Sequence, residues 1–156
     1  MYFLGLVVFM VFLVCSTLLS NSLASFIDLP SITITLAFSI PMLMASGLFP
    51  DFIRGFKIMG QKINTWSLFE LKKTEIALQL MIKLLLFSGL FGSIIGIVSI
   101  LSNFSGMSTI GPNLSLSILT FFYSVLIVFI LLPVKAKVKA IILAFEKECS
   151  DEESIN

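Results

Sequence analysis

The chain has 156 residues, of which 58% are apolar and only 12% are charged, and its mean hydropathy is +1.10. A water-soluble domain of this length is excluded, because so few charged side chains cannot cover its surface. This apolar composition predicts a lipid bilayer as the surrounding medium. The formal net charge is only +1, so we expect no nucleic-acid partner.

Four apolar runs follow one another along the chain, at about residues 1–19, 31–49, 76–101 and 114–134. Each is long enough to cross a hydrocarbon core of roughly 30 Å as a helix. The sequence therefore predicts an all-α membrane protein with four transmembrane helices. We expect one four-helix membrane domain over residues 1–145, with a cytoplasmic loop at 51–75, and a flexible acidic tail over residues 146–156.

Positive charge is distributed unevenly between the connecting segments. All ten Lys and Arg residues lie between the second and third runs, within the third run, or after the fourth. The alternate connections, residues 20–30 and 102–113, contain a single charged residue, Asp28. Because basic loops stay in the cytoplasm, we expect both termini and the central loop on the cytoplasmic side.

Two helical patterns lie around the central loop. From Asp51 to Trp66 the apolar side chains recur at helical spacing among basic residues, which predicts a cytoplasmic interfacial helix. A basic linker anchored by Trp66 is the alternative. Ser67 and Glu70 form a capping-box pattern, and unbroken apolar periodicity follows them. We therefore expect one long helix over about residues 68–101, which projects beyond the bilayer at its first turns.

The fourth run also continues past the membrane. Pro133 predicts a kink near its cytoplasmic end. Apolar residues at helical spacing then continue from Val134 to Phe145, with lysines among them. The third and fourth helices are therefore both expected to extend into the cytoplasm.

Small and hydroxylated side chains form a stripe along the third and fourth runs. Gly89, Gly92 and Gly96 share one helical face, which predicts close helix packing. Lipid offers hydroxyl groups no hydrogen-bond partner, so the hydroxyls should face other helices, a cavity or water. We predict a polar ion pathway, and the alternative for its residues is helix packing or bonding back to the same helix. The predicted pathway residues are Ser93, Ser117, Thr120 and Ser124.

No Asp, Glu or His lies inside any of the four runs. A cycle driven by protons needs a group whose charge changes at membrane depth, so another chain would have to supply that group. Asp28 stands at the outer end of the second run, where it either caps the helix or meets ions at the outer mouth. Cys15 and Cys149 lack metal-ligand spacing, and we expect neither a metal site nor a cofactor.

Three segments of the chain resemble one family. Residues 26–58, FIDLPSITITLAFSIPMLMASGLFPDFIRGFKI, are similar to the outer loop and second span of the MotA branch of the MotA/TolQ/ExbB proton-channel family. Residues 88–103, SGLFGSIIGIVSILSN, resemble the glycine pattern of the family's third span. Residues 110–137, IGPNLSLSILTFFYSVLIVFILLPVKAK, resemble its fourth span. Together these segments cover well over half of the chain in the family's order.

The resemblance implies a channel subunit that passes protons or sodium and serves as the stator of an ion-driven membrane motor, not an enzyme. In that family a homopentameric ring in the bacterial inner membrane surrounds two copies of a single-span partner of the MotB/ExbD/TolR type. The partner's Asp binds the ion. By position, Ser93 stands where the family usually has Thr, Thr120 matches the Thr of the fourth span, and Pro133 matches its terminal Pro.

The chain departs from the family pattern in three ways. Leu86 stands where the flagellar branch has Pro, and Phe121 replaces a common second Thr. The central loop is also short, whereas the flagellar branch has a large cytoplasmic domain there, so a rotor-contacting surface is not expected. Two interpretations follow: a minimal ion-driven motor subunit, or a non-conducting membrane scaffold of the same fold.

Overall fold

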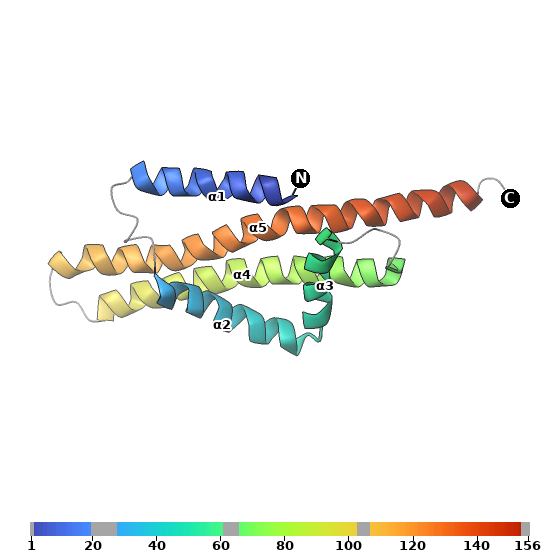
Figure 1. Ribbon diagram of the computed structural model, residues 1–156. Helices are drawn as coiled ribbons and strands as arrows, with labels where there is room; N and C mark the ends of the chain where they lie inside the picture. The colour runs from blue at the N-terminus through green and yellow to red at the C-terminus, as the bar shows by residue number, and fades with distance from the viewer. Residues whose placement is uncertain (1, 20–27, 61–65, 103–106, 154–156) are drawn as a thin grey trace.

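The computed structural model describes residues 2–19, 28–60, 66–102 and 107–153, which form five helices (Figure 1). They are α1 (Tyr2–Leu19), α2 (Leu29–Ala45), α3 (Phe49–Gly60), α4 (Leu68–Ser102) and α5 (Met107–Glu153). The all-α class predicted from the sequence is confirmed for this part of the chain.

The two longest helices, α4 and α5, lie side by side along most of the molecule (Figure 1). α2 packs against both of them, and α3 crosses them farther along. α1 lies beside α5, where Phe9 and Phe129 have ring centroids 5.8 Å apart. We call the end of the bundle where α2 begins the Asp28 end, and the opposite end, where α3 lies and α5 finishes, the basic end.

Among the described residues, two helices are long and apolar enough to cross a membrane: α4, and α5 over Ser117–Ser150. The bent pair α2 and α3 adds a third span if it is counted as one. α1 is apolar but shorter over its described side chains, Leu4–Leu18. The chain is thus built as a membrane protein, with two or three spans by length and composition.

The interior of the bundle changes character along its length. Towards the basic end it is an apolar core, formed mainly by residues 71–85 of α4 and residues 128–142 of α5. Towards the Asp28 end the surface of α4 is apolar instead, and Phe87 and Phe91 are each more than half exposed. Apart from Leu119, the buried side chains in that half are hydroxylated: Ser31, Thr35, Ser39, Ser88, Ser117, Thr120 and Ser124. A polar interior beneath an apolar surface suits a bundle surrounded by lipid.

The chain bends by 107° between α2 and α3. Gly47 lies at the bend with a φ of +71°, in the left-handed region that residues with a Cβ atom rarely adopt. The helix predicted over residues 31–49 therefore ends earlier, and its observed range is Leu29–Ala45. The predicted interfacial helix is confirmed as a helix from Phe49 to Gly60, and residues 61–65 lie outside the described part of the chain.

We expect Gly47→Ala to lower the free energy of unfolding by about 1–2 kcal/mol, which is the cost of the left-handed conformation for a residue with a Cβ. Thermal unfolding in mild detergent measures the effect. Gly60→Ala is the matched control, because a Cβ there meets no atom within 4 Å and φ is not left-handed. Equal melting temperatures for the two variants would contradict the role of Gly47.

The predicted capping box at the start of α4 is confirmed. The Ser67 hydroxyl accepts a hydrogen bond from the Glu70 N–H at 3.3 Å. Glu70 Oε2 accepts from the Ser67 N–H at 3.1 Å and from the Ser67 hydroxyl at 3.0 Å. Both bonds from Ser67 favour the charged carboxylate and hold the pKa of Glu70 below its ordinary value, and the bond from the Ser67 N–H has the larger effect of the two. α4 then runs unbroken from Leu68 to Ser102, as the periodicity predicts.

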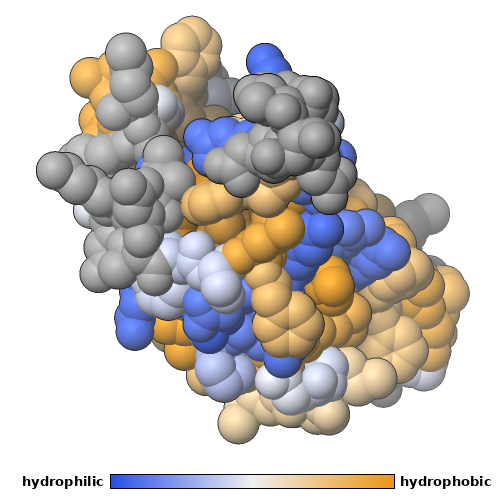
Figure 2. Space-filling view, turned by 90° about the vertical axis from the view of Figure 1, so that its right-hand side faces the viewer, coloured by the Kyte–Doolittle hydropathy of each residue, from blue (hydrophilic) through white to orange (hydrophobic). Residues whose placement is uncertain are grey.

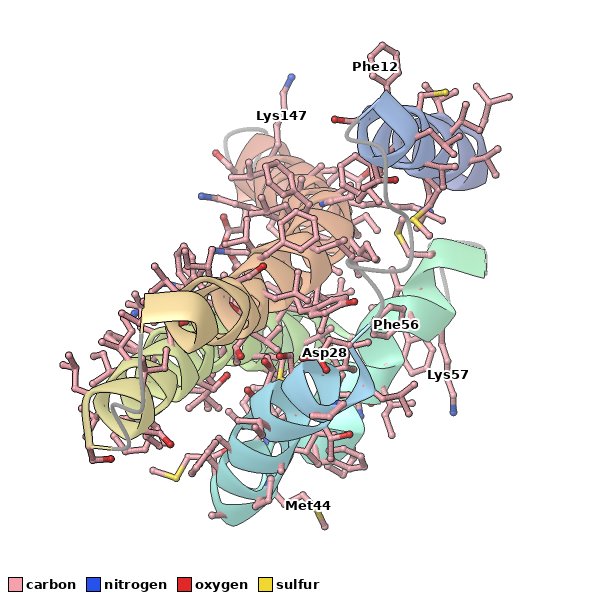
Figure 3. The ribbon with its side chains drawn as sticks, turned by 90° about the vertical axis from the view of Figure 1, so that its left-hand side faces the viewer. Phe12, Asp28, Met44, Phe56, Lys57 and Lys147 are labelled. Atoms are coloured by element: carbon pink, nitrogen blue, oxygen red, sulfur yellow. The ribbon has the colours of Figure 1, made fainter. Side chains whose placement is uncertain are left out.

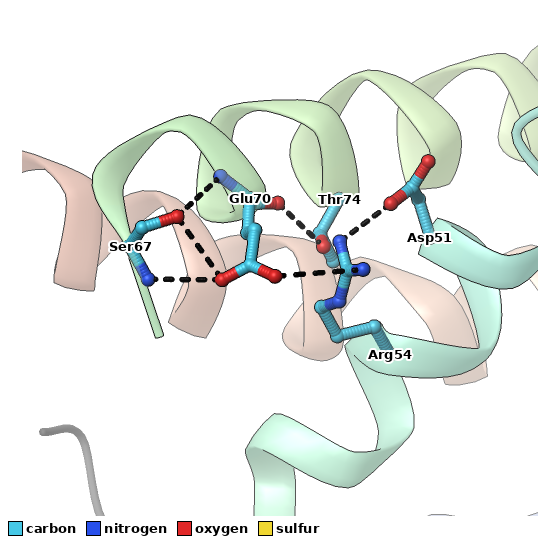
Figure 4. A network of polar contacts seen from close by, with 5 residues as sticks. All are labelled: Asp51, Arg54, Ser67, Glu70 and Thr74. Atoms are coloured by element: carbon cyan, nitrogen blue, oxygen red, sulfur yellow. Dashed lines mark hydrogen bonds and ion pairs between the residues drawn. The ribbon is translucent and has the colours of Figure 1, made fainter. Parts of the chain in front are cut away.

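A polar network at the basic end attaches α3 to α4 (Figure 4). Arg54 donates to Asp51 Oδ1 at 2.5 Å, and its guanidinium lies 3.8 Å from Glu70 Oε1. The same guanidinium lies 5.6 Å from the centroid of the Trp66 ring, close enough for a cation–π contact. Viewed from this end, hydrophilic side chains lie between apolar ones over the surface (Figure 2).

α5 is one continuous helix from Met107 to Glu153 and passes through Pro133 without ending. The sequence predicts a flexible tail from residue 146, and the helix boundary is corrected to Glu153. Two contacts explain the longer helix. Lys72 of α4 forms an ion pair with Glu146 at 2.8 Å, and Ile141 and Ile142 are buried in the apolar core one turn earlier.

Candidate functional site

Each of the three glycines predicted to allow close packing faces a hydroxylated residue of α5. A Cβ atom on Gly89 would overlap the Ser124 side chain, and one on Gly96 would overlap the Ser117 side chain. A Cβ on Gly92 would lie 2.7 Å from Cγ2 of Thr120, which is closer than real Cβ contacts. The pairs Gly89–Ser124, Gly92–Thr120 and Gly96–Ser117 therefore set the register of the antiparallel helices α4 and α5.

Hydroxyl groups of α4 and α5 bond to main-chain carbonyls at this contact. Ser93 donates to Gly89 O at 2.9 Å and to Ser117 O at 2.7 Å, so its hydroxyl joins the two helices. Ser124 donates to Phe121 O of its own helix at 3.0 Å. These partners correspond to the packing and back-bonding alternatives that the sequence left open.

α2 contributes a second row of hydroxyls that the sequence analysis missed. Ser31, Thr35 and Ser39 are buried on one face of α2. The Ser31 and Thr120 hydroxyl oxygens are 3.0 Å apart, and those of Ser39 and Ser88 are 2.9 Å apart. The signal was present in the sequence, because the three α2 residues are spaced four apart and must share a helical face.

Thr35 occupies the middle of this row. Its hydroxyl donates to Ser31 O at 2.9 Å and lies 3.4 Å from Thr120 O. Ser39 in turn donates to Thr35 O at 2.7 Å. The side chains of α2, α4 and α5 thus place hydroxyl groups at the contacts between all three helices, and we call this set of contacts the hydroxyl seam. Its members are Ser31, Thr35, Ser39, Ser88, Ser93, Ser117, Thr120 and Ser124.

The seam begins at Asp28, which precedes the first turn of α2. Asp28 Oδ2 accepts a hydrogen bond from the Ser31 N–H at 3.2 Å and another from the Ser31 hydroxyl. The Asp28 N–H donates to the Tyr123 hydroxyl oxygen at 3.1 Å, which ties the start of α2 to α5. Viewed from this end, Asp28 lies near the middle of the bundle, whereas Phe12 and Met44 point outwards (Figure 3). Asp28 therefore caps α2.

A cavity of about 560 Å³ opens at the Asp28 end of the seam. Its polar lining consists of Asp28, Ser31, Ser99, Ser117 and Thr120, and the rest is Pro30 together with isoleucines and glycines of α2 and α4. The expectation that Asp28 caps α2 is confirmed. Its carboxylate also lines this cavity, and a role at an ion mouth stays a prediction. Of the predicted pathway residues, Ser117 and Thr120 line this cavity, whereas Ser93 and Ser124 are not part of its lining.

The chemistry available to this site is limited by its residue types. Hydroxyl groups can relay a proton along hydrogen bonds or coordinate a cation through oxygen, but they do not change charge at ordinary pH. Asp28 is the acidic residue in the seam and its cavity. Over the described ranges, no group of three or more His, Cys, Asp or Glu residues is placed to hold a metal ion.

No protein-family model matches this chain, and no curated protein matches it. The resemblance to the MotA/TolQ/ExbB family therefore stays a prediction.

The Ser39–Ser88 pair offers a test of the seam as a structural contact. Ser39→Ala should destabilise the protein by about 0.5–1.5 kcal/mol, because it removes the Ser39–Ser88 contact while the Ser88 hydroxyl keeps its bond to Leu85 O. Removing both hydroxyls in Ser39→Ala/Ser88→Ala should cost less than the sum of the single changes. A double-mutant cycle of thermal unfolding in detergent measures the difference. Strict additivity would contradict the pairing.

Proposed function

We propose that this chain is a channel subunit of an ion-driven membrane motor, in which it conducts protons, or sodium, together with an acid-bearing partner. The observation that carries the proposal is the buried hydroxyl seam, which opens onto a cavity with a carboxylate at the Asp28 end. Buried hydroxyls also occur in the packed interfaces of membrane helices, so the cavity at the Asp28 end, and not the hydroxyls alone, is what favours a channel subunit over a membrane anchor.

In the proposed arrangement α1, α2, α4 and α5 each cross the bilayer of a bacterial inner membrane. The basic end faces the cytoplasm, because Arg54, Lys57, Lys72 and Lys73 gather there with the lysines of the second half of α5. The Asp28 cavity then opens on the opposite side, from which ions enter under the ion-motive force. The short α3 leaves no large domain for contact with a cytoplasmic rotor.

The seam lacks a titratable group at membrane depth, and this indicates what a partner protein would supply. Between Ser31 and Ser88 the seam holds only hydroxyls, and a conformational cycle needs a group that gains and loses charge inside the membrane. We propose that this group is the Asp of a single-span protein of the MotB/ExbD/TolR type. Five copies of this chain would form a ring around two copies of that protein, as in the family that the sequence resembles.

A non-conducting scaffold of the same fold is the second candidate. The contacts at the glycines favour it, because Ser93 and Ser124 donate to main-chain carbonyls and Ser124 fits against Gly89 of α4. A scaffold and a channel subunit share this packing, so the presence of ion flux distinguishes them.

Isolation of the tagged chain from its native membrane tests the partner. We expect mass spectrometry of the co-purified material to identify a protein with one membrane span and an Asp near the start of that span. Particle images should show five-fold symmetry around a central density. A monomer without a second protein species would contradict the motor proposal.

Vesicles that contain the isolated complex test conduction. With an imposed pH or sodium gradient, we expect flux that disappears when the partner's Asp is replaced by Asn. A complex that assembles normally and shows no flux above that of the Asn variant would establish the scaffold instead.

A further inference from the structure

Two adjoining cavities of about 650 Å³ and about 420 Å³ separate α1 from α5. Gly5 and Phe9 of α1 and Phe129 of α5 line both, so the cavities form one groove along the bundle. The groove lining is almost entirely aliphatic and aromatic. Gly5 faces open space, because a Cβ atom there would meet nothing within 4 Å.

The length of this α1–α5 groove matches one leaflet of a bilayer. It extends along α1 from Gly5 to Thr17, which is about 18 Å at 1.5 Å per residue. Half of a hydrocarbon core of roughly 30 Å is about 15 Å. An extended acyl chain of a single lipid therefore has the right length and chemistry to lie in the groove.

Lys137 lies where the groove reaches the basic end, and it is the charged residue among the described residues that line the groove. Its half-buried ammonium donates to Met59 O at 3.1 Å and lies 3.4 Å from Ile58 O. These carbonyls belong to the last turn of α3, where a cation is favoured by the helix dipole. An ammonium has three N–H donors, so one stays available and the positive charge is held in place at the end of the groove.

We propose that the α1–α5 groove binds one anionic phospholipid, with an acyl chain between α1 and α5 and the headgroup phosphate on Lys137. The apolar lining and the leaflet-sized length select an acyl chain. The fixed cation at one end selects a phosphate, and a headgroup with net negative charge binds more tightly than a zwitterionic one. The lipid completes the packing of α1, which otherwise meets the rest of the chain at few side chains such as the Phe9–Phe129 pair.

Native mass spectrometry of the purified protein tests the proposal, with dioleoyl phosphatidylglycerol or dioleoyl phosphatidylcholine added as probes of equal chain length. We expect one tightly held phosphatidylglycerol per chain. Lys137→Gln should lower retention of phosphatidylglycerol roughly fivefold and bring it near that of phosphatidylcholine. Gly5→Leu fills the groove and should lower retention of both lipids.

Two matched controls separate the site from general effects. Lys147→Gln removes an exposed lysine farther along α5, and Gly111→Leu adds a side chain where a Cβ meets nothing within 4 Å. Neither should change lipid retention. Unchanged phosphatidylglycerol retention in Lys137→Gln and Gly5→Leu, with circular dichroism like that of the wild type, would overturn the proposal. Loss of an oligomer in Gly5→Leu without loss of lipid would also overturn it, because the groove would then hold a second copy of the chain.

Discussion

Gly89→Ala is expected to force α4 and α5 apart, because the added methyl group occupies the space of the Ser124 side chain. Overpacking of a tight interior contact costs about 1–3 kcal/mol. The same substitution at an exposed helical glycine stabilises by up to roughly 1 kcal/mol through helix propensity. We therefore expect opposite signs for Gly89→Ala and for the control Gly111→Ala, whose Cβ would meet nothing within 4 Å.

A compensating change makes this prediction specific to the pair. Ser124→Gly removes the atoms that the new methyl group would overlap, so the double variant Gly89→Ala/Ser124→Gly should recover most of the lost stability. Thermal unfolding in detergent gives the stability of the wild type, of the two single variants and of the double variant. Size-exclusion chromatography shows whether each of them assembles. If Ser124→Gly worsens Gly89→Ala by its own full effect, the two residues do not meet across the α4–α5 contact.

Thr120→Val is expected to slow ion flux through the isolated complex by roughly fivefold to tenfold, the kinetic equivalent of about 1 kcal/mol for one hydrogen bond. Valine keeps the methyl group that lies against Gly92 but removes the oxygen that lies 3.0 Å from the Ser31 hydroxyl. The change therefore alters the polar lining of the Asp28 cavity with little change in shape. Dye-loaded vesicles with an imposed gradient give the rate.

Thr33→Val is the matched control for Thr120. Thr33 donates to Leu29 O of its own helix at 3.0 Å, and its side chain is exposed on α2 and lies outside the cavity. We expect normal flux from Thr33→Val. Equal flux in the wild type and in Thr120→Val, with equal melting temperatures, would remove Thr120 from the ion path and favour the scaffold.

Local patterns in the sequence predicted most of the helices. The Ser67–Glu70 capping box and the periodicity after it placed α4 from Leu68 to Ser102, because hydrogen bonds within three or four residues decide a helix start. The end of α2 was predicted less well. A positive φ at Gly47 turns the chain before Phe49, and glycine permits such a turn without requiring it.

The candidate site was predicted in part. The glycines of α4 and the hydroxyls of α5 were identified from their spacing, and Asp28 from its position before α2. Their pairing was not, because the register of two antiparallel helices depends on contacts between residues far apart in the chain. The row on α2, Ser31 to Ser39, was not predicted, because these hydroxyls stand in a run that is apolar enough overall to form an ordinary membrane helix.

The sequence by itself determined that this protein belongs in a membrane and that its long helices carry a hydroxylated, uncharged face. That follows from composition and from helical periodicity, which are properties of the chain alone. Only the tertiary structure decided that this face is covered by α2 of the same chain, with Ser31 on Thr120 and Ser39 on Ser88. In lipid a hydroxyl is stabilised wherever it finds a partner, so which helix supplies that partner is settled by packing and not by local sequence.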